Sequence, residues 1–179
     1  MIMNNPLRYA LCAFFAIAAA GAASALTVSV APAQHVAESE GASSPTPLDS
    51  FMSGCLDGLY DAGFIATNAP ARDMDRSQWS EVSYGLAGTK EGFVDYVVAV
   101  FVTWRPSSLK KEAWLATGCD YRIVRVSDGK VVASGSLQGE TDGPDLVADP
   151  DKSARSMGAG LGKSCAALIH GVVTSNGGE

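Results

Sequence analysis

A long apolar stretch over residues 93–104 most constrains what this chain can fold into. Its side chains alternate as in a strand, and both alternating sets are apolar. One set is Val94, Tyr96, Val98, Val100, Val102 and Trp104, and the other is Val97, Ala99 and Phe101. A strand with apolar residues on both faces belongs in the middle of a sheet. The chain is therefore expected to build a sheet around this segment.

A β-hairpin is predicted directly after this strand. Residues 114–126 alternate between apolar and polar positions, and residues 130–138 do so again. Asp128-Gly129 between them is the favoured two-residue hairpin turn. In the first strand of the hairpin, Asp120 and Arg122 share the polar face. This pattern is typical of strands with one buried face.

Two long helices are predicted, one on each side of the strands in the sequence. Apolar residues recur every three or four positions after Thr46-Pro47 and again after Asp149-Pro150, up to about Val172. The simplest arrangement is an α+β domain. Both helices pack on one face of a three- to four-stranded antiparallel meander sheet.

Small residues recur at four-residue spacing in the second helix, at Ala154, Gly158, Gly162 and Ala166. They form a smooth ridge along which another backbone can approach closely. Each glycine costs up to ~1 kcal/mol of helix propensity, so close packing must compensate. The overlapping segment Gly158–Ser164 ends like a phosphate-binding loop. A phosphate-binding loop needs a glycine where Met157 stands. Such a loop also follows a strand, whereas this segment lies within the predicted helix, so we expect no nucleotide binding.

The N-terminus has the pattern of a secretory signal peptide. A polar start up to Arg8 precedes an uncharged apolar run over residues 11–20, and Ala23-Ser24-Ala25 suits signal peptidase. We expect cleavage after Ala25 and a periplasmic or secreted protein. Residues 26–46 are expected to be a linker or loosely ordered lead-in, residues 47–173 the single domain, and residues 174–179 a disordered tail.

The charge of the mature chain excludes several classes of partner. Without residues 1–25 it carries 12 basic and 19 acidic residues, a net charge of −7. An acidic chain without a basic stripe repels phosphate backbones and anionic lipid surfaces, so we expect neither nucleic acid nor membrane-surface binding. No apolar run in the mature chain is long enough to span a bilayer.

Three cysteines remain after cleavage: Cys55, Cys119 and Cys165. In the meander topology the two helices are antiparallel, which places Cys55 and Cys165 near the same end on apolar faces. A disulfide between them is one interpretation, because export leads to an oxidising compartment. The alternative is three reduced, buried cysteines that act as small hydrophobic residues.

No motif for catalysis, metal binding or a cofactor stands out. The acidic segment 140–151 lacks the residue order of a calcium loop, and neither His35 nor His170 has a partner for a catalytic triad. We expect no metal and no cofactor.

The candidate interaction residues are aromatic or acidic. Trp79, Trp104 and Trp114 could line a groove, although packing in or around the core is the favoured interpretation. Asp142 and Asp145 lie in the acidic segment before the second helix. Together these five residues are the predicted interaction surface.

The chain resembles the periplasmic penicillin-binding-protein activator lipoproteins and the curli-secretion lipoprotein family. The residues that carry the resemblance are the strand 94–104, the hairpin 121–135 and the Ala/Gly-rich helix 153–169. The resemblance implies a small extracytoplasmic α+β domain that binds protein partners and has no catalytic residues.

These observations predict an exported, non-catalytic binding or interaction module of the bacterial envelope, with an envelope protein as partner. One alternative is a small extracytoplasmic enzyme or ligand-binding protein. Its site would assemble from scattered residues such as Asp73, Asp75, His170 and the tryptophans. A second alternative is a purely structural envelope component.

Export predicts a defined mature N-terminus. The intact mass of protein recovered from the periplasm or medium should correspond to a chain that begins at Leu26. Ala25→Leu should leave the precursor uncleaved, because signal peptidase needs a small residue there. The matched variant Ser24→Leu changes only the middle residue of the Ala23-Ser24-Ala25 triplet, at which signal peptidase does not require a small residue. This precursor should still be cleaved. Recovery of a chain that retains Met1 from both variants and the wild type would contradict the prediction.

Overall fold

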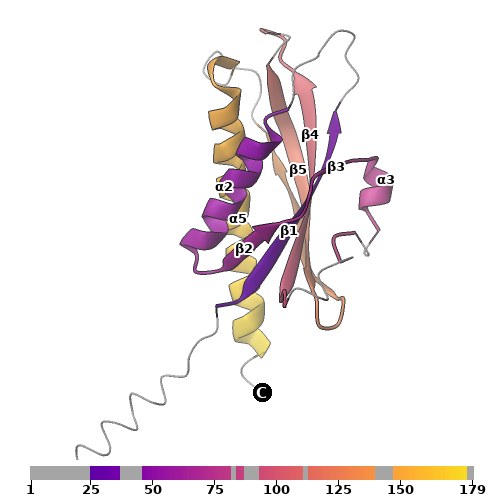
Figure 1. Cartoon of the computed structure of the whole chain (residues 1–179), viewed down its shortest axis with the longest axis vertical. Coiled ribbons are helices and arrows are strands. Elements are labelled where there is room, and N and C mark those ends of the chain that lie inside the picture. The colour runs from indigo at the N-terminus through magenta and orange to yellow at the C-terminus, as the bar shows by residue number, and fades with distance from the viewer. Residues whose placement is uncertain are drawn as a thin grey trace, which may run out of the picture.

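The computed structural model describes residues 25–36, 46–81, 84–86, 93–110, 113–139 and 147–176. These residues form one mixed sheet with the strand order β2-β1-β4-β5-β6, and β3 also pairs with β1. Helices α2 and α5 lie side by side on one face of the sheet, and the short helix α3 lies on the other (Figure 1). The elements are β1 (Thr27–Val36), α2 (Leu48–Asp61), β2 (Ile65–Asn68), β3 (Arg72–Asp73), α3 (Arg76–Trp79), β4 (Tyr96–Pro106), β5 (Trp114–Arg125), β6 (Val131–Gln138) and α5 (Pro150–Asn176).

The predicted α+β class is confirmed, but the predicted simple meander is wrong. β4, β5 and β6 are antiparallel neighbours in chain order, as expected. β1, however, runs parallel to β4 on one side and parallel to β2 and β3 on the other. The sheet is therefore mixed, with more strands than the three or four expected. α5 extends to Asn176, so part of the expected tail 174–179 is helical.

β1 occupies residues that we expected to be a linker. Within 26–46, residues 27–36 form an inner strand of the sheet, whereas 37–45 lie outside the described residues. Pro32 argues against such a strand because it cannot donate a ladder hydrogen bond. The structure accommodates Pro32 opposite the break between β2 and β3, which pair with β1 before and after it. The Tyr84 hydroxyl donates to the Pro32 carbonyl oxygen at 2.7 Å and so takes the place of a strand partner.

The two faces of β4 carry two separate apolar clusters, as its alternation predicts. On the helix side, Val98, Val100 and Trp104 belong to the main core beneath α2 and α5. On the outer side, Ala99 and Phe101 belong to a smaller cluster beneath α3. We call these two sides of the sheet the helix face and the outer face.

α2 and α5 cross with their backbones in direct contact through two pairs of glycines. The predicted small-residue ridge on α5 meets Gly54 and Gly58 of α2, which have the same four-residue spacing as Gly158 and Gly162. A Cβ atom at Gly158 would overlap the carbonyl oxygen of Phe51, and comparable overlaps with backbone atoms arise at the other three glycines. The ridge therefore has the close-packing role that its spacing predicts.

No helix in the described ranges is long and apolar enough to cross a membrane.

The glycine crossing makes a prediction for stability. Gly158→Ala and Gly54→Ala should each lower the free energy of unfolding by about 1–3 kcal/mol or more, because the new methyl group meets rigid backbone. Gly160→Ala is the matched control on the same helix. A Cβ there meets no atom within 4 Å, so the better helix propensity of alanine should stabilise by up to ~1 kcal/mol. Urea denaturation measures all three, and equal effects at positions 158 and 160 would contradict the prediction.

Candidate functional site

A buried arginine holds α3 on the outer face of the sheet. Arg122 of β5 donates to three successive carbonyl oxygens at the end of α3, those of Trp79 at 3.0 Å, Ser80 at 2.9 Å and Glu81 at 2.6 Å. Its guanidinium also lies 5.0 Å from the centre of the Trp79 ring. Burial lowers the pKa of Arg122. The position of α3 thus depends on one charged side chain that the sheet supplies.

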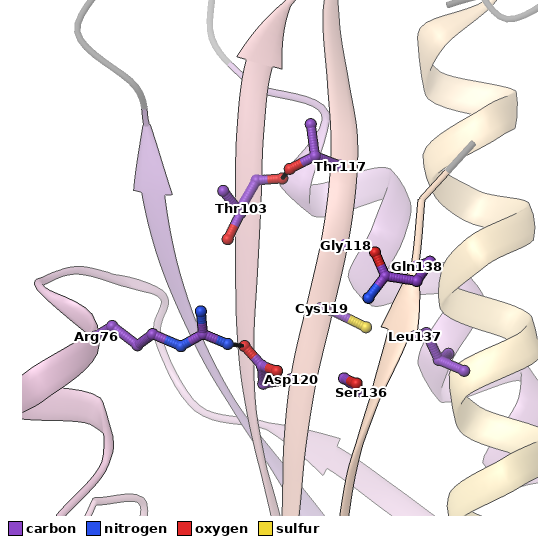
Figure 2. Close-up of a pocket in the computed structure, with 9 residues that line it drawn as sticks. All are labelled: Arg76, Thr103, Thr117, Gly118, Cys119, Asp120, Ser136, Leu137 and Gln138. Carbon is purple, nitrogen blue, oxygen red and sulfur yellow. Dashed lines mark hydrogen bonds and ion pairs between the residues drawn. The ribbon is translucent and has the colours of Figure 1, made fainter. Parts of the chain in front are cut away.

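Next to α3, the outer face is open over β5 and β6, and a shallow pocket of about 340 Å³ lies there (Figure 2). We call it the outer recess. Residues from α3 and three neighbouring strands contribute to it. They are Arg76, Thr103, Thr117, Gly118, Cys119, Asp120, Ser136, Leu137 and Gln138.

One ion pair supplies the charge in the outer recess. Arg76 of α3 reaches across to the Asp120 carboxylate of β5, as Figure 2 shows. The Arg76 side chain is 64% exposed and the Asp120 side chain 23% exposed. The other polar groups are hydroxyls and an amide. Of these, Thr117 donates to the Thr103 carbonyl oxygen at 3.1 Å.

Cys119 is the only thiol among the residues that line the outer recess. A nucleophile would need a depressed pKa or an adjacent base. Burial instead raises the pKa of the Cys119 thiol to about 12. Across the described residues, no cluster of His, Cys, Asp and Glu is arranged to hold a metal ion. The arrangement offers hydrogen bonds and one pair of opposite charges to a ligand.

Two further pockets flank the sheet. One of about 320 Å³ lies between α5 and the ends of β5 and β6, where Met157 and Leu137 help to line it. Another of about 460 Å³ lies beside β1 and β3, where His35, Asp73 and Asp75 contribute.

The scattered residues proposed for an enzyme site are not brought together. Asp73 and Asp75 line the pocket beside β3. His170 lies on α5, with its ring 4.7 Å from the Phe64 ring and its Nε2 3.3 Å from the Ala62 carbonyl oxygen. These groups therefore do not share a pocket in the described structure.

The three tryptophans are buried. Trp104 and Trp114 belong to the main core, and Trp79 covers Phe101 on the outer face at a ring distance of 5.6 Å. They support the fold and form no exposed interaction surface. Asp142 and Asp145 of the predicted surface lie outside the described residues.

The predicted disulfide between Cys55 and Cys165 is absent, because Cys55, Cys119 and Cys165 are all free and buried. They come from α2, β5 and α5 and lie in one core. Burial raises the pKa of Cys55 to about 12 and also raises that of Cys165. Disulfide formation requires a thiolate, which such burial disfavours. The structure therefore has the alternative arrangement, in which the cysteines act as small hydrophobic residues.

The sequence analysis did not identify the residues that form the outer recess, although the sequence contains one indication of a polar outer face. The alternation of β5 places Asp120 and Arg122 on the face opposite the core, which indicates a polar outer face. Arg76 gives no such signal, because α3 is one turn long and reaches the sheet only through tertiary contacts.

Comparisons with known proteins give weak structural similarities. No protein-family model matches the chain, and no curated protein matches it. PelC from Paraburkholderia phytofirmans, solved as a dodecamer, has 19% identity and a TM-score of 0.49 over 78% of this chain and 87% of its own. Lipoprotein GNA1162 from Neisseria meningitidis has 14% identity and a TM-score of 0.44, over 83% of this chain and 99% of its own.

The C-terminal domain of LpoB from Salmonella enterica is also similar, with 10% identity and a TM-score of 0.40. That match covers 72% of this chain and 92% of the LpoB domain. The expected resemblance is thus found as a weak similarity of α+β fold.

The buried thiols make a prediction for labelling. Iodoacetamide should leave the native protein unmodified at neutral pH and should add three groups to the mature chain in urea without reductant. Intact mass spectrometry counts the groups. Addition of a single group in urea would show that two of the three cysteines are bridged and would contradict the free thiols of the structure.

The same thiols predict a dependence of stability on alkaline pH. A thiol whose pKa rises from 9.0 to about 12 on folding keeps its proton longer in the folded state. Its contribution is complete below the unfolded pKa of 9.0 and is lost as the pH rises towards 12. The free energy of unfolding should therefore fall above about pH 9. Cys119→Ala, although less stable at neutral pH, should show a shallower fall in urea titrations.

Proposed function

We propose that this protein is an exported interaction module of the bacterial envelope that binds a protein partner at the outer recess and carries out no catalysis. One observation carries the proposal. The outer face is covered by α3 over part of its width and is left open over β5 and β6, where polar side chains and an ion pair line a hollow. A polar, partly open hollow of this kind fits the hydrogen-bonding rim of a protein interface.

The ion pair in the recess is available to a partner. A solvent-exposed pair of this type contributes only about 0–1 kcal/mol to folding, so little stability is lost when a partner engages it. Arginine is also enriched among the residues that carry binding energy at protein interfaces. Arg76 is therefore the side chain expected to contribute most to binding.

The start of the domain supports export. Leu26, the first residue after the expected cleavage site, packs against the main core, and its carbonyl oxygen accepts a hydrogen bond from the Ile65 N–H at 3.0 Å. Cleavage after Ala25, which is exposed, would leave these contacts intact. The folded domain can therefore begin directly behind the signal peptide.

In-cell photocrosslinking tests the proposal. A photoreactive residue at Thr103, in the outer recess, should give a discrete crosslinked product with another envelope protein. The matched site is the exposed Thr67 on β2, which should give none. Crosslinking equally from both sites, or from neither under several growth conditions, would favour a purely structural role.

Charge reversal at Arg76 tests whether the side chains of the outer recess are responsible for the Thr103 crosslink. Arg76→Glu should lower the yield of the Thr103 crosslink at least about tenfold, because it places two negative charges together and removes an interfacial arginine. Arg155→Glu is the matched control, since Arg155 is also in an exposed ion pair, 2.7 Å from Asp57, on the helix side. The control should leave the yield unchanged.

A further inference from the structure

The two edges of the sheet differ in how well they resist pairing with another strand. One edge consists of β2 and β3, which are four and two residues long and are separated by a segment that contains Pro70. The other edge is β6, eight residues long, and no described strand pairs with its far side. Prolines, charged residues and bulges are the usual features that keep an exposed edge from pairing. β6 contains no proline and no charged residue, and its one bulge, at Val132, lies near its start, so the segment from Ala133 to Gln138 is regular.

The register of β6 shows which of its backbone groups are unpaired. The Gly139 N–H donates to the Thr117 carbonyl oxygen at 2.8 Å, in continuation of the register between β5 and β6. Hydrogen-bonded pairs alternate with non-hydrogen-bonded pairs along antiparallel strands. The N–H and C=O groups of Ser134, Ser136 and Gln138 therefore point away from β5, towards the open edge. The side chains of all three are exposed.

We propose that a second copy of this chain pairs with this edge, β6 against β6, antiparallel about a two-fold axis at Gly135. In this register Ser134 of one copy lies opposite Ser136 of the other, on both sides of the axis. Both residues have outward backbone groups, so the N–H groups of one strand meet the C=O groups of the other. The two sheets become one continuous sheet.

In this register the side chains of the two β6 strands are compatible with each other on both faces of the sheet. The serines stay on the outer face, and on the helix face Leu137 of one copy lies opposite Ala133 of the other, a large residue beside a small one. At the axis, Gly135 leaves room for the Tyr121 side chain, whose hydroxyl would lie 2.6 Å from a Cβ atom there. The two Gly135 residues thus add no side chains of their own at the axis, where Tyr121 of each copy lies on the helix face.

The charge distribution favours a second copy over a charged peptide. The mature chain has a net charge of −7, so two copies repel each other over most orientations. β6 is neutral along its whole length, so no like charges face each other when it pairs with itself. A basic peptide would need acidic residues along the strand, and β6 has none. Ser136 and Gln138 also line the outer recess, so the paired edge borders that site, but the pairing does not require the partner proposed there.

Sedimentation and light scattering of the exported protein test the pairing from micromolar to millimolar concentration. A reversible dimer should form. Ser134→Lys should raise its dissociation constant at least about tenfold, because lysines from both copies meet near the axis. Thr67→Lys, which adds the same charge to the other edge, should have no effect. A monomer at every concentration, or a dimer that both variants leave unchanged, would overturn the proposal.

Amide hydrogen exchange locates the contact. The Ser134, Ser136 and Gln138 amides should exchange more slowly as concentration rises, whereas the Thr67 amide should not change. A dimer in which these amides exchange at a concentration-independent rate would also overturn the proposal. Loss of the Thr103 crosslink with the dimer intact would reject only the proposed recess function, so the two ideas fail separately.

Discussion

The rest of this structure depends on the backbone contact between α2 and α5. Four glycines, two from each helix, remove every side chain at the crossing. Glycine weakens a helix by ~1 kcal/mol per position relative to alanine, so neither helix is favoured at these positions in isolation. Together they form a single layer of two closely spaced helices that covers the helix face of the sheet. Phe51, Leu161 and Ile169 can then reach the valines of β1 and β4 from one side.

The outer face is covered in a different way. There a single-turn helix is held by the hydrogen bonds of one buried arginine, with Trp79 stacked over its guanidinium. This cover is narrow, so the sheet is covered on both faces beneath α3 and on the helix face alone over β5 and β6. The main core provides stability on one side, while the polar strand surface stays accessible on the other. The division between the folding core and the proposed binding surface thus follows the two faces of one sheet.

The sequence predicts the local elements well and the non-local ones poorly. The apolar alternation of β4, the Asp128-Gly129 turn and the helical spacing each reflect neighbours in the chain, and β4, the β5–β6 hairpin, α2 and α5 are all confirmed. β1 was missed because it contains Pro32, which is accommodated by segments distant in the sequence. Pro32 lies opposite the break between β2 and β3, and its carbonyl oxygen accepts a hydrogen bond from Tyr84. The glycine ridge of α5 was predicted, but its partner glycines in α2 were not. The outer recess needs α3 in place, and α3 depends on Arg122, a tertiary contact that no local pattern encodes.

The parallel pairing of β1 with β4 has a consequence for the order of folding. β1 is at the N-terminal end of the domain, yet its ladder partner lies much later in the chain. The Thr27 N–H, for example, donates to the Asp95 carboxylate across 68 residues. Such distant contacts close slowly, because loop-closure entropy must be overcome before they form. β2 and β3, which are nearer in the chain, pair with only one side of β1. The topology therefore leaves the other side of β1 without its strand partner until β4 has been made.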